Sequence, residues 1–312
     1  MSGKLFAVGV DVGGSHISSA IIDLKEMGIV KNSLVTVNVD NHAEASEILN
    51  IWSANIQSLV SQINPEDLAG IGLAMPGPFD YANGIALFES RKYQKLFGIN
   101  IREEMRTRLG LDESLVIRFI NDAIAFAIGE CWMGKAKEAK RAVAITLGTG
   151  FGSAFLEHGI PIVEGEEVPK SGCVWHMPYH DGIADDSFST RWFTNNYLER
   201  SGKSLPGVKE IATLYESDVL VRELFHEFGN NLAEFLSPSL TKFDAEILVI
   251  GGNIGGAYQL FGPSFLRGLK DRQVITVSVL SELKEDAALI GGARLLDHQF
   301  WLRIKDLLPG MS

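Results

Sequence analysis

The stretch LFAVGVDVGGSHISSAIIDL, residues 5–24, holds two apolar runs that a glycine turn separates. Residues 6–10 and 17–22 have the length and composition of buried β-strands, and the turn between them is DVGGS, residues 11–15. Glycines in a turn have no Cβ, so backbone N–H groups can approach an anionic ligand closely. We therefore predict a strand, a turn suited to phosphate, and a returning strand.

The second half of the chain repeats this pattern. Residues 142–147 form an apolar run, residues 148–152 a glycine turn (GTGFG), and residues 153–156 an apolar return. A third apolar run, residues 247–250, enters another glycine turn. None of these turns matches the P-loop or the dinucleotide-binding fingerprint. The repeat predicts a duplicated α/β lobe. Its phosphate-binding turns belong neither to the P-loop class nor to the dinucleotide-binding class.

A strand-to-helix junction lies between the two copies of the pattern. Residues 115–120 read as a strand, and Asn121 and Asp122 open a helix rich in small residues. Such a junction places side chains at the carboxyl edge of a sheet, where ligands bind in α/β proteins. An Asp at a helix start is also a common N-cap. The spacing therefore leaves Asp122 either as a helix cap or as a catalytic carboxylate.

The spacing of apolar residues and the positions of helix-ending glycines predict several further helices and strands. Apolar residues recur with helical spacing over residues 43–63, residues 71–74 read as a strand, and residues 101–109 as a helix that Gly110 closes. The charged side chains of residues 102–108 are expected on a solvated helix face. A final helix is predicted over residues 287–300.

Composition narrows the function classes. A chain of 312 residues favours two lobes, and its net charge of −11 argues against a nucleic-acid groove without excluding a nucleotide. The two cysteines, Cys131 and Cys173, indicate a reducing compartment. The N-terminus lacks the form of a signal peptide, and no apolar stretch reaches the roughly 18 residues of a membrane span. We expect a cytoplasmic protein that binds neither nucleic acid nor membrane.

Five motifs occur in a fixed order along the chain: Asp11-Val12-Gly13-Gly14-Ser15, Pro76-Gly77-Pro78-Phe79-Asp80, Asn121-Asp122-Ala123, Gly148-Thr149-Gly150-Phe151-Gly152 and Gly251-Gly252-Asn253. This series resembles the ROK family (repressors, open reading frames and sugar kinases) of the actin/hexokinase-like ATPase superfamily. The resemblance covers nearly the whole chain. It implies an α/β fold of two duplicated ribonuclease H-like (actin-like ATPase) lobes with mixed sheets around a central cleft.

The resemblance also predicts how the chain divides into lobes and how it assembles. We expect an N-terminal α/β lobe at residues 1–120 and a larger C-terminal α/β lobe at residues 121–295. A C-terminal helix at about residues 296–312 is expected to pack back on the first lobe. The family resemblance further suggests a homodimer.

Carried over to this chain, the motifs imply a site for ATP, Mg²⁺ and a sugar. Asp11 would position Mg²⁺, acting through water, and Asp122 would accept the proton of the attacking sugar hydroxyl. The implied residues for phosphate and adenosine are Asp11, Gly13, Gly14, Ser15, Gly148, Thr149, Gly150, Gly251, Gly252 and Asn253. Those implied for the sugar are Gly77, Asn121, Asp122, His176 and Asp185.

The chain departs from the family pattern near the sugar-binding residues. Family members carry Glu-x-Gly-His before a cysteine-rich zinc loop, whereas this chain has Cys173-Val174-Trp175-His176 and lacks the cysteines of that loop. We therefore expect a variant without a zinc site. His176 is either a sugar contact or a structural histidine. The acidic residue after the loop corresponds to Asp185, with Asp186 as the second choice, and either could instead belong to a solvated acidic loop.

These observations predict an ATP-dependent sugar kinase that acts on a hexose or amino sugar. The preference for glucose, usual in this family, is not assumed, because Cys173 removes a hydrogen-bond acceptor and Trp175 adds bulk. The alternative is a catalytically degenerate sugar-binding or regulatory ROK protein without a DNA-binding domain. A sugar-responsive repressor is disfavoured, because the phosphate turn begins at Asp11 and the charge is acidic.

Overall fold

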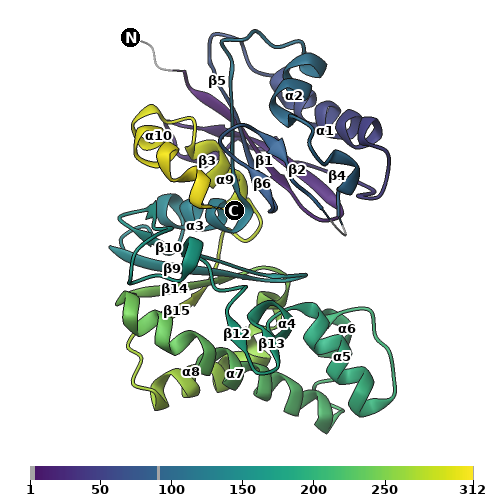
Figure 1. The fold of residues 1–312 in the computed structure, drawn as a ribbon, viewed down its shortest axis with the longest axis vertical. Coiled ribbons are helices and arrows are strands. Elements are labelled where there is room, and N and C mark those ends of the chain that lie inside the picture. The colour runs from purple at the N-terminus through teal and green to yellow at the C-terminus, as the bar shows by residue number, and fades with distance from the viewer. Residues whose placement is uncertain (1–3, 90–91, 312) are drawn as a thin grey trace. The chain divides into compact units, whose positions relative to one another are not determined.

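The computed structural model of the protein describes residues 4–89 and 92–311. The chain divides into two compact units, which are described separately below. The first unit runs to Gly134 and resumes at Glu285, and the second comprises Lys135–Lys284. Both contain a sheet with parallel and antiparallel strands and helices packed against it (Figure 1).

The first unit is built on a mixed sheet with the order β3-β2-β1-β5-β8, to which β4 adds by pairing with β2. The β1–β2 pair is the antiparallel hairpin predicted from residues 5–24, and β5 and β8 continue the sheet in parallel. The strands are β1 (Phe6–Val12), β2 (His16–Asp23), β3 (Gly28–Ile29), β4 (Val35–Asn38), β5 (Leu68–Met75) and β8 (Val116–Asn121), with a separate hairpin of β6 (Phe79–Asp80) and β7 (Ile85–Ala86).

Helices cover both faces of this sheet (Figure 1). α1 packs on β1, β2 and β4, while α9 packs on β1 and β5 and lies along α3. Strand glycines allow the contact with α9, because a Cβ at Gly72 would lie only 1.9 Å from the carbonyl oxygen of Gly292. The helices are α1 (Ala45–Val60), η1 (Gln94–Leu96), α2 (Ile101–Leu109), α3 (Asp122–Met133), α9 (Asp286–Arg294), α10 (His298–Ile304) and η4 (Lys305–Gly310).

The second unit has a sheet with the order β11-β10-β9-β14-β15 and the long helices α7 and α8 on one face of it (Figure 1). Its strands are β9 (Arg141–Leu147), β10 (Phe151–Glu157), β11 (Ile160–Pro161), β14 (Ile247–Gly251) and β15 (Val277–Leu280), with the hairpin β12 (Pro178–Tyr179) and β13 (Gly182–Ile183). Its helices are η2 (Lys170–Gly172), α4 (Ala184–Ser187), α5 (Thr190–Ser201), α6 (Val208–Ala212), α7 (Val219–Phe243), η3 (Asn253–Ala257) and α8 (Tyr258–Asp271).

The two sheets share a topology. In the first, the order β2-β1-β5-β8 places an antiparallel hairpin beside two parallel strands, and β10-β9-β14-β15 repeats this order in the second. A glycine turn joins the two strands of each hairpin, as the repeated sequence pattern predicts.

The boundaries of the units differ from those expected at residues 120 and 295. Residues 121–134 and 285–295, which were assigned to the second lobe, belong to the first unit. The physical reason is the packing of α3 against α9 and of α9 against the first sheet. The last predicted helix, residues 287–300, is two helices, because the Asp297 carboxylate accepts the Phe300 N–H at 2.7 Å and caps a new helix, α10.

Within the described residues, no helix has both the length and the apolar character that crossing a membrane requires.

Candidate active site

The turn between β1 and β2 is held by three hydrogen bonds to its carbonyl groups. These carbonyls belong to Gly13, Gly14 and Ser15, the residues that the motif assigned to phosphate. The donors come from segments remote in sequence, so the turn is fixed by the fold of the first unit. They are the Tyr93 hydroxyl to Gly13 at 2.7 Å, the Asn41 side-chain amide to Gly14, and the Val39 N–H to Ser15 at 2.9 Å.

The N–H groups of the same turn are differently placed. Gly13 donates to the carbonyl oxygen of His16 at 3.0 Å, which closes the turn. In the described part of the chain, the amides of Gly14 and Ser15 have no hydrogen-bond acceptor. Two adjacent unoccupied N–H groups on a rigid turn are what an anion such as phosphate requires.

Asp11 ends the buried run of β1 and lies near two further carboxylates. Burial, followed by the negative charges of Asp122 and Glu285, raises the pKa of Asp11 to about 7. A half-buried carboxylate with acidic neighbours favours a nearby cation. No group of three or more His, Cys, Asp and Glu side chains in the described residues could hold a metal ion directly. Asp11 supplies one carboxylate, and a single carboxylate is a usual protein ligand of Mg²⁺, which keeps several waters when bound.

Asn121, and not Asp122, is the residue that caps α3. Its Oδ1 accepts the N–H groups of Ala123 at 3.0 Å and Ile124 at 3.2 Å, so Asn121 is the N-cap. Asp122 is the first helical residue and accepts the Ala123 N–H at 2.8 Å. Burial raises the pKa of Asp122, against the opposing effects of these hydrogen bonds and of the Lys92 charge. A carboxylate that is more basic than usual suits proton acceptance.

Tyr81 links Gly77 to Asn121. Its hydroxyl donates to the carbonyl oxygen of Met75 at 3.3 Å and accepts the Asn121 side-chain amide at 3.2 Å. A Cβ at Gly77 would lie 3.6 Å from the same hydroxyl. With its Oδ1 engaged as the cap, Asn121 can offer a ligand only its remaining amide hydrogen.

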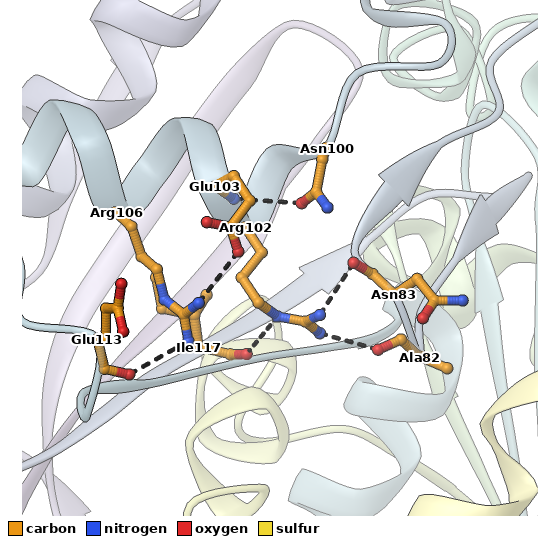
Figure 2. Close-up of polar contacts among 8 residues, drawn as sticks. All are labelled: Ala82, Asn83, Asn100, Arg102, Glu103, Arg106, Glu113 and Ile117. Atoms are coloured by element: carbon orange, nitrogen blue, oxygen red, sulfur yellow. Dashed lines mark hydrogen bonds and ion pairs between the residues drawn. The ribbon is translucent and has the colours of Figure 1, made fainter.

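Arg102 anchors the β6–β7 hairpin that carries Tyr81 to the rest of the unit. Its guanidinium donates to the carbonyls of Ala82 at 3.0 Å, Asn83 at 2.9 Å and Ile117 at 3.2 Å (Figure 2). The side chain is half-buried, and burial lowers its pKa. The expectation that Arg102 lies on a solvated helix face was therefore wrong, because its three partners are backbone carbonyls that no sequence pattern reveals.

In the second unit, the turn of Gly148, Thr149 and Gly150 is held by the corner that joins α4 to α5. Thr190 donates to the Gly148 carbonyl from its N–H at 2.8 Å and from its hydroxyl at 3.0 Å. Asp185 Oδ1 accepts the Phe151 N–H at 2.7 Å, and a Cβ at Gly150 would lie 2.9 Å from that oxygen. Thr149 itself is exposed.

Asp185 has a second partner, Arg191, whose guanidinium donates to its Oδ2 at 2.6 Å. Both carboxylate oxygens are therefore engaged within the unit, one by the turn and one by α5. Its own N–H donates to the carbonyl of Trp175 at 3.0 Å, which ties the segment of His176 to the same corner. The side chain of Asp186 accepts the Ile183 N–H at 3.3 Å.

Cys173 and His176 lie together, with Sγ 3.8 Å from the imidazole Nδ1. Burial raises the pKa of the Cys173 thiol to about 11, so the thiol is neutral near pH 7. Burial and the nearby Lys170 charge lower the pKa of His176, which favours a neutral imidazole. The pair is a weak, uncharged hydrogen-bonding group, in contrast to the carboxylate that the family pattern places at residue 173.

Gly251 is the last residue of β14, and Gly252 and Asn253 follow it. Gly252 has φ 80°, and a Cβ there would lie 2.4 Å from the carbonyl oxygen of Leu147, the residue before the turn of Gly148. Only glycine accommodates both conditions without strain. This close backbone approach brings the third glycine segment next to the second within one unit.

The ROK family model matches residues 7–299 of the chain. This protein belongs to the ROK family. Glucokinase of Thermotoga maritima is 24% identical to it over 95% of this chain and 98% of its own length. The N-acetyl-D-glucosamine kinase of Vibrio cholerae is 26% identical over 79% of this chain and 83% of its own length.

A solved structure of similar fold is the ROK glucokinase from Streptomyces griseus in complex with glucose and AMPPNP. Its TM-score to this protein is 0.74 at 20% identity, and the match covers 93% of this chain and 98% of that one. The likeness confirms the predicted fold class, an α/β protein of the actin-like ATPase type with mixed sheets.

In this ROK protein, the residues predicted from motifs form two groups. Asp11, Asp122 and the turn of Gly13 and Gly14 lie together in the first unit. The turn of residues 148–150 lies with Asp185 and Gly252 in the second. Motif reasoning missed Lys92, whose ammonium group lies beside Gly14, and Tyr93, whose hydroxyl holds Gly13. Both belong to a polar loop without a motif, so only the tertiary contacts identify them.

Proposed function

We propose that this ROK protein is an ATP-dependent sugar kinase that transfers a phosphoryl group from MgATP to a hydroxyl of a hexose or amino sugar. The observation that carries this proposal is the association of Asp11 and Asp122 with a turn whose Gly14 and Ser15 amides are unoccupied among the described residues. A phosphate-binding turn beside two carboxylates of raised pKa supplies positioning, cation binding and proton acceptance. Phosphoryl transfer depends chiefly on these three functions.

Asp11 is assigned to Mg²⁺, which it would hold through water. When bound with ATP, Mg²⁺ neutralises phosphate charge. The raised pKa of Asp11 supports this role, because a nearby cation would offset its burial and the charges of Asp122 and Glu285. Gly13, Gly14 and Ser15 would receive the terminal phosphates through their N–H groups.

Asp122 is assigned as the general base. Because Asn121 already caps α3, the Asp122 carboxylate is not required for that structural function. It would orient the sugar hydroxyl and take its proton as the bond to phosphorus forms.

We assign the remaining nucleotide contacts, to phosphate and to adenosine, to residues of the second unit. Gly148, Thr149 and Gly150 would contact phosphate, and Gly251, Gly252 and Asn253 would contact the adenosine. Support comes from the rigid backbone contact at Gly252 and the Thr190 clamp on Gly148, which pre-organise both segments.

The sugar is assigned to Gly77, Asn121, Asp122, His176 and Asp185. Glucose and N-acetyl-D-glucosamine are the named substrates of the relatives, and both are candidates here. A neutral thiol at Cys173 accepts hydrogen bonds poorly, so we infer that one sugar hydroxyl is absent, substituted or differently held. No zinc is assigned, and elemental analysis of the purified protein would test this.

One observation favours a second candidate, a sugar-binding protein without catalysis. The Asp185 carboxylate is engaged by both Phe151 and Arg191, which limits its capacity to bind a sugar hydroxyl. A homodimer and a cytoplasmic location remain predictions; light scattering on the purified protein would test the first.

The decisive experiment is ADP release with MgATP across glucose, mannose, N-acetylglucosamine, N-acetylmannosamine and fructose. We expect sugar-dependent turnover that Asp122→Asn lowers by about 100-fold or more, while Asp271→Asn, an exposed control at the end of α8, retains it. MgATP binding without turnover on any of these sugars would favour the non-catalytic candidate.

A further inference from the structure

Lys92 has a defined position beside the phosphate turn of the first unit. A Cβ built on Gly14 would lie 2.3 Å from Lys92 Nζ and 2.9 Å from its Cε. The ammonium group and the end of its stem therefore occupy the space directly over the Gly14 backbone. The side chain is half-buried.

The neighbouring residue fixes this position. Tyr93 is fully buried, and its hydroxyl donates to the Gly13 carbonyl at 2.7 Å. Its N–H donates to the carbonyl oxygen of Asn41 at 2.9 Å, and the Asn41 side chain in turn donates to Gly14. The ring packs against Trp52 at 5.2 Å between centroids. Lys92 therefore precedes a residue, Tyr93, that hydrogen bonds hold against the turn.

The charge of Lys92 is uncompensated within the described residues. No carboxylate there lies within 4.0 Å of its Nζ, whereas Lys95, three residues on, pairs with Glu44 at 3.1 Å. Lys92 is close enough to Asp122 for its charge to oppose the rise in the pKa of that carboxyl. The ammonium group thus lies beside Gly14 of the turn, and its charge acts on the candidate base.

We propose that Lys92 is a catalytic residue that contacts the oxygens of the transferred γ-phosphoryl group. This inference rests on the proposed function. A bond forms between the sugar oxygen and the γ-phosphorus as the proton passes to Asp122, and the bond from that phosphorus to the β–γ bridging oxygen breaks with its electrons leaving on ADP. Lys92 stays protonated throughout. It stabilises the negative charge on the equatorial oxygens as a point charge that pre-organised backbone holds in place.

Nucleotide binding tests the contact without a sugar. Calorimetry with MgATP and MgADP on the full chain compares the unmodified protein, Lys92→Met and Lys95→Met. We expect Lys92→Met to weaken MgATP binding by about tenfold and MgADP binding by less than about twofold, because only ATP carries the γ-phosphate. Lys95→Met removes a lysine from the same segment and should leave both affinities unchanged.

Equal affinity for MgATP in Lys92→Met and the unmodified protein would overturn the inference while leaving the proposed function intact. An equal loss for both nucleotides would overturn it too, since it would place the ammonium at a phosphate common to ATP and ADP. Failure of the unmodified protein to bind MgATP would overturn the proposed function together with the inference.

Turnover separates catalysis from binding once a sugar substrate has been found. Lys92→Met should lower kcat by about 100-fold and Lys92→Arg should restore part of it, because arginine keeps the charge with a different geometry. The sugar KM should change by less than about threefold. A rise in sugar KM with unchanged kcat would show that Lys92 contacts the sugar instead, and would contradict the assignment.

Discussion

The Asp11 carboxylate has a pKa that burial and neighbouring charges raise, and this makes the stability of the fold depend on pH. Burial and the charges of Asp122 and Glu285 raise its pKa to about 7, so the folded protein without ligand binds a proton there that the unfolded chain releases at much lower pH. Between these two pKa values the folded state holds more protons than the unfolded state. The contribution of Asp11 therefore lowers stability as pH rises from about 4 to 7.

Replacing Asp11 by Asn removes this penalty. We expect Asp11→Asn to raise the free energy of unfolding by about 1–3 kcal/mol at pH 8, and by less at pH 5, where the folded protein already holds the proton. Thermal unfolding without Mg²⁺ or nucleotide, at both pH values, measures the difference. Asp271→Asn, at an exposed position at the end of α8, is the control. A decrease in stability at pH 8 would show that the Asp11 carboxylate is already compensated in the folded protein.

The same titration predicts the pH dependence of nucleotide binding. Below about pH 7 the Asp11 carboxyl is protonated and offers no charge to Mg²⁺, so MgATP affinity should rise between pH 6 and pH 8. Calorimetry in two buffers of different ionisation enthalpy would detect the accompanying proton release. Asp11→Asn should abolish the release, and an unchanged release in that variant would assign the proton to another group.

At the scale of the element, α9 joins the first sheet and α3 by close backbone packing. It lies on β1 and β5 and along α3 at distances that only glycine permits, with Gly72 facing Gly292 and Gly129 facing Ala287. Interiors packed this closely cannot accept an added methyl group without moving backbone.

Gly72→Ala tests this packing. Its Cβ would lie 1.9 Å from the Gly292 carbonyl oxygen, so α9 must shift, and we expect a loss of about 2–4 kcal/mol in unfolding free energy. Gly28→Ala is the control, because a Cβ at that strand position meets nothing within 4 Å. Chemical denaturation of both variants gives the comparison; equal stabilities would mean that α9 adapts at no cost.

The β6–β7 hairpin illustrates a second element whose role depends on one residue. Arg102 binds the carbonyl groups of Ala82 and Asn83 in this hairpin (Figure 2). The adjoining Tyr81 hydroxyl accepts the Asn121 side-chain amide. We expect Arg102→Met to raise the sugar KM by about fivefold and to leave MgATP affinity unchanged, because it loosens the partner of Asn121 and not the phosphate turn. Arg106→Met, one turn along the same helix and paired with Glu103, should change neither constant.

At the scale of the whole molecule, the two units differ in how the chain builds them. The second is one continuous segment, Lys135–Lys284, with its own cluster of buried apolar residues around α7. The first needs two segments, because α9 comes from the end of the chain and supplies buried residues such as Leu289 and Ile290.

This difference predicts the behaviour of fragments. Residues 135–284 alone should unfold cooperatively, whereas residues 1–134 alone should not, because the surface that α9 covers would face water. Joining residues 285–312 to residues 1–134 through a flexible linker should restore cooperative unfolding. Circular dichroism during thermal unfolding measures all three. A folded 1–134 fragment would contradict the assignment of α9 to the core of the first unit.

Much of the architecture follows from local sequence. Short apolar runs and glycine turns predict the hairpins β1–β2 and β9–β10, and apolar spacing predicts α1 and α2, because these signals act over a few residues. The motif order indicates the ROK family, which the family model confirms. It also predicts Asp11 and Asp122 as functional carboxylates, and their roles stay predictions.

The sequence by itself determined the hairpins β1–β2 and β9–β10, the strands β5, β8 and β14, the glycine turns and the membership of the family. Only the tertiary structure decided that Asn121 caps α3, that both oxygens of Asp185 are engaged, and that Arg102 is half-buried against backbone carbonyls. It also placed Lys92 over the turn of residues 11–15, the feature from which the fold was first inferred. The physical reason is that these facts depend on hydrogen bonds and charges between segments far apart in the chain, which leave no periodic signal in the sequence.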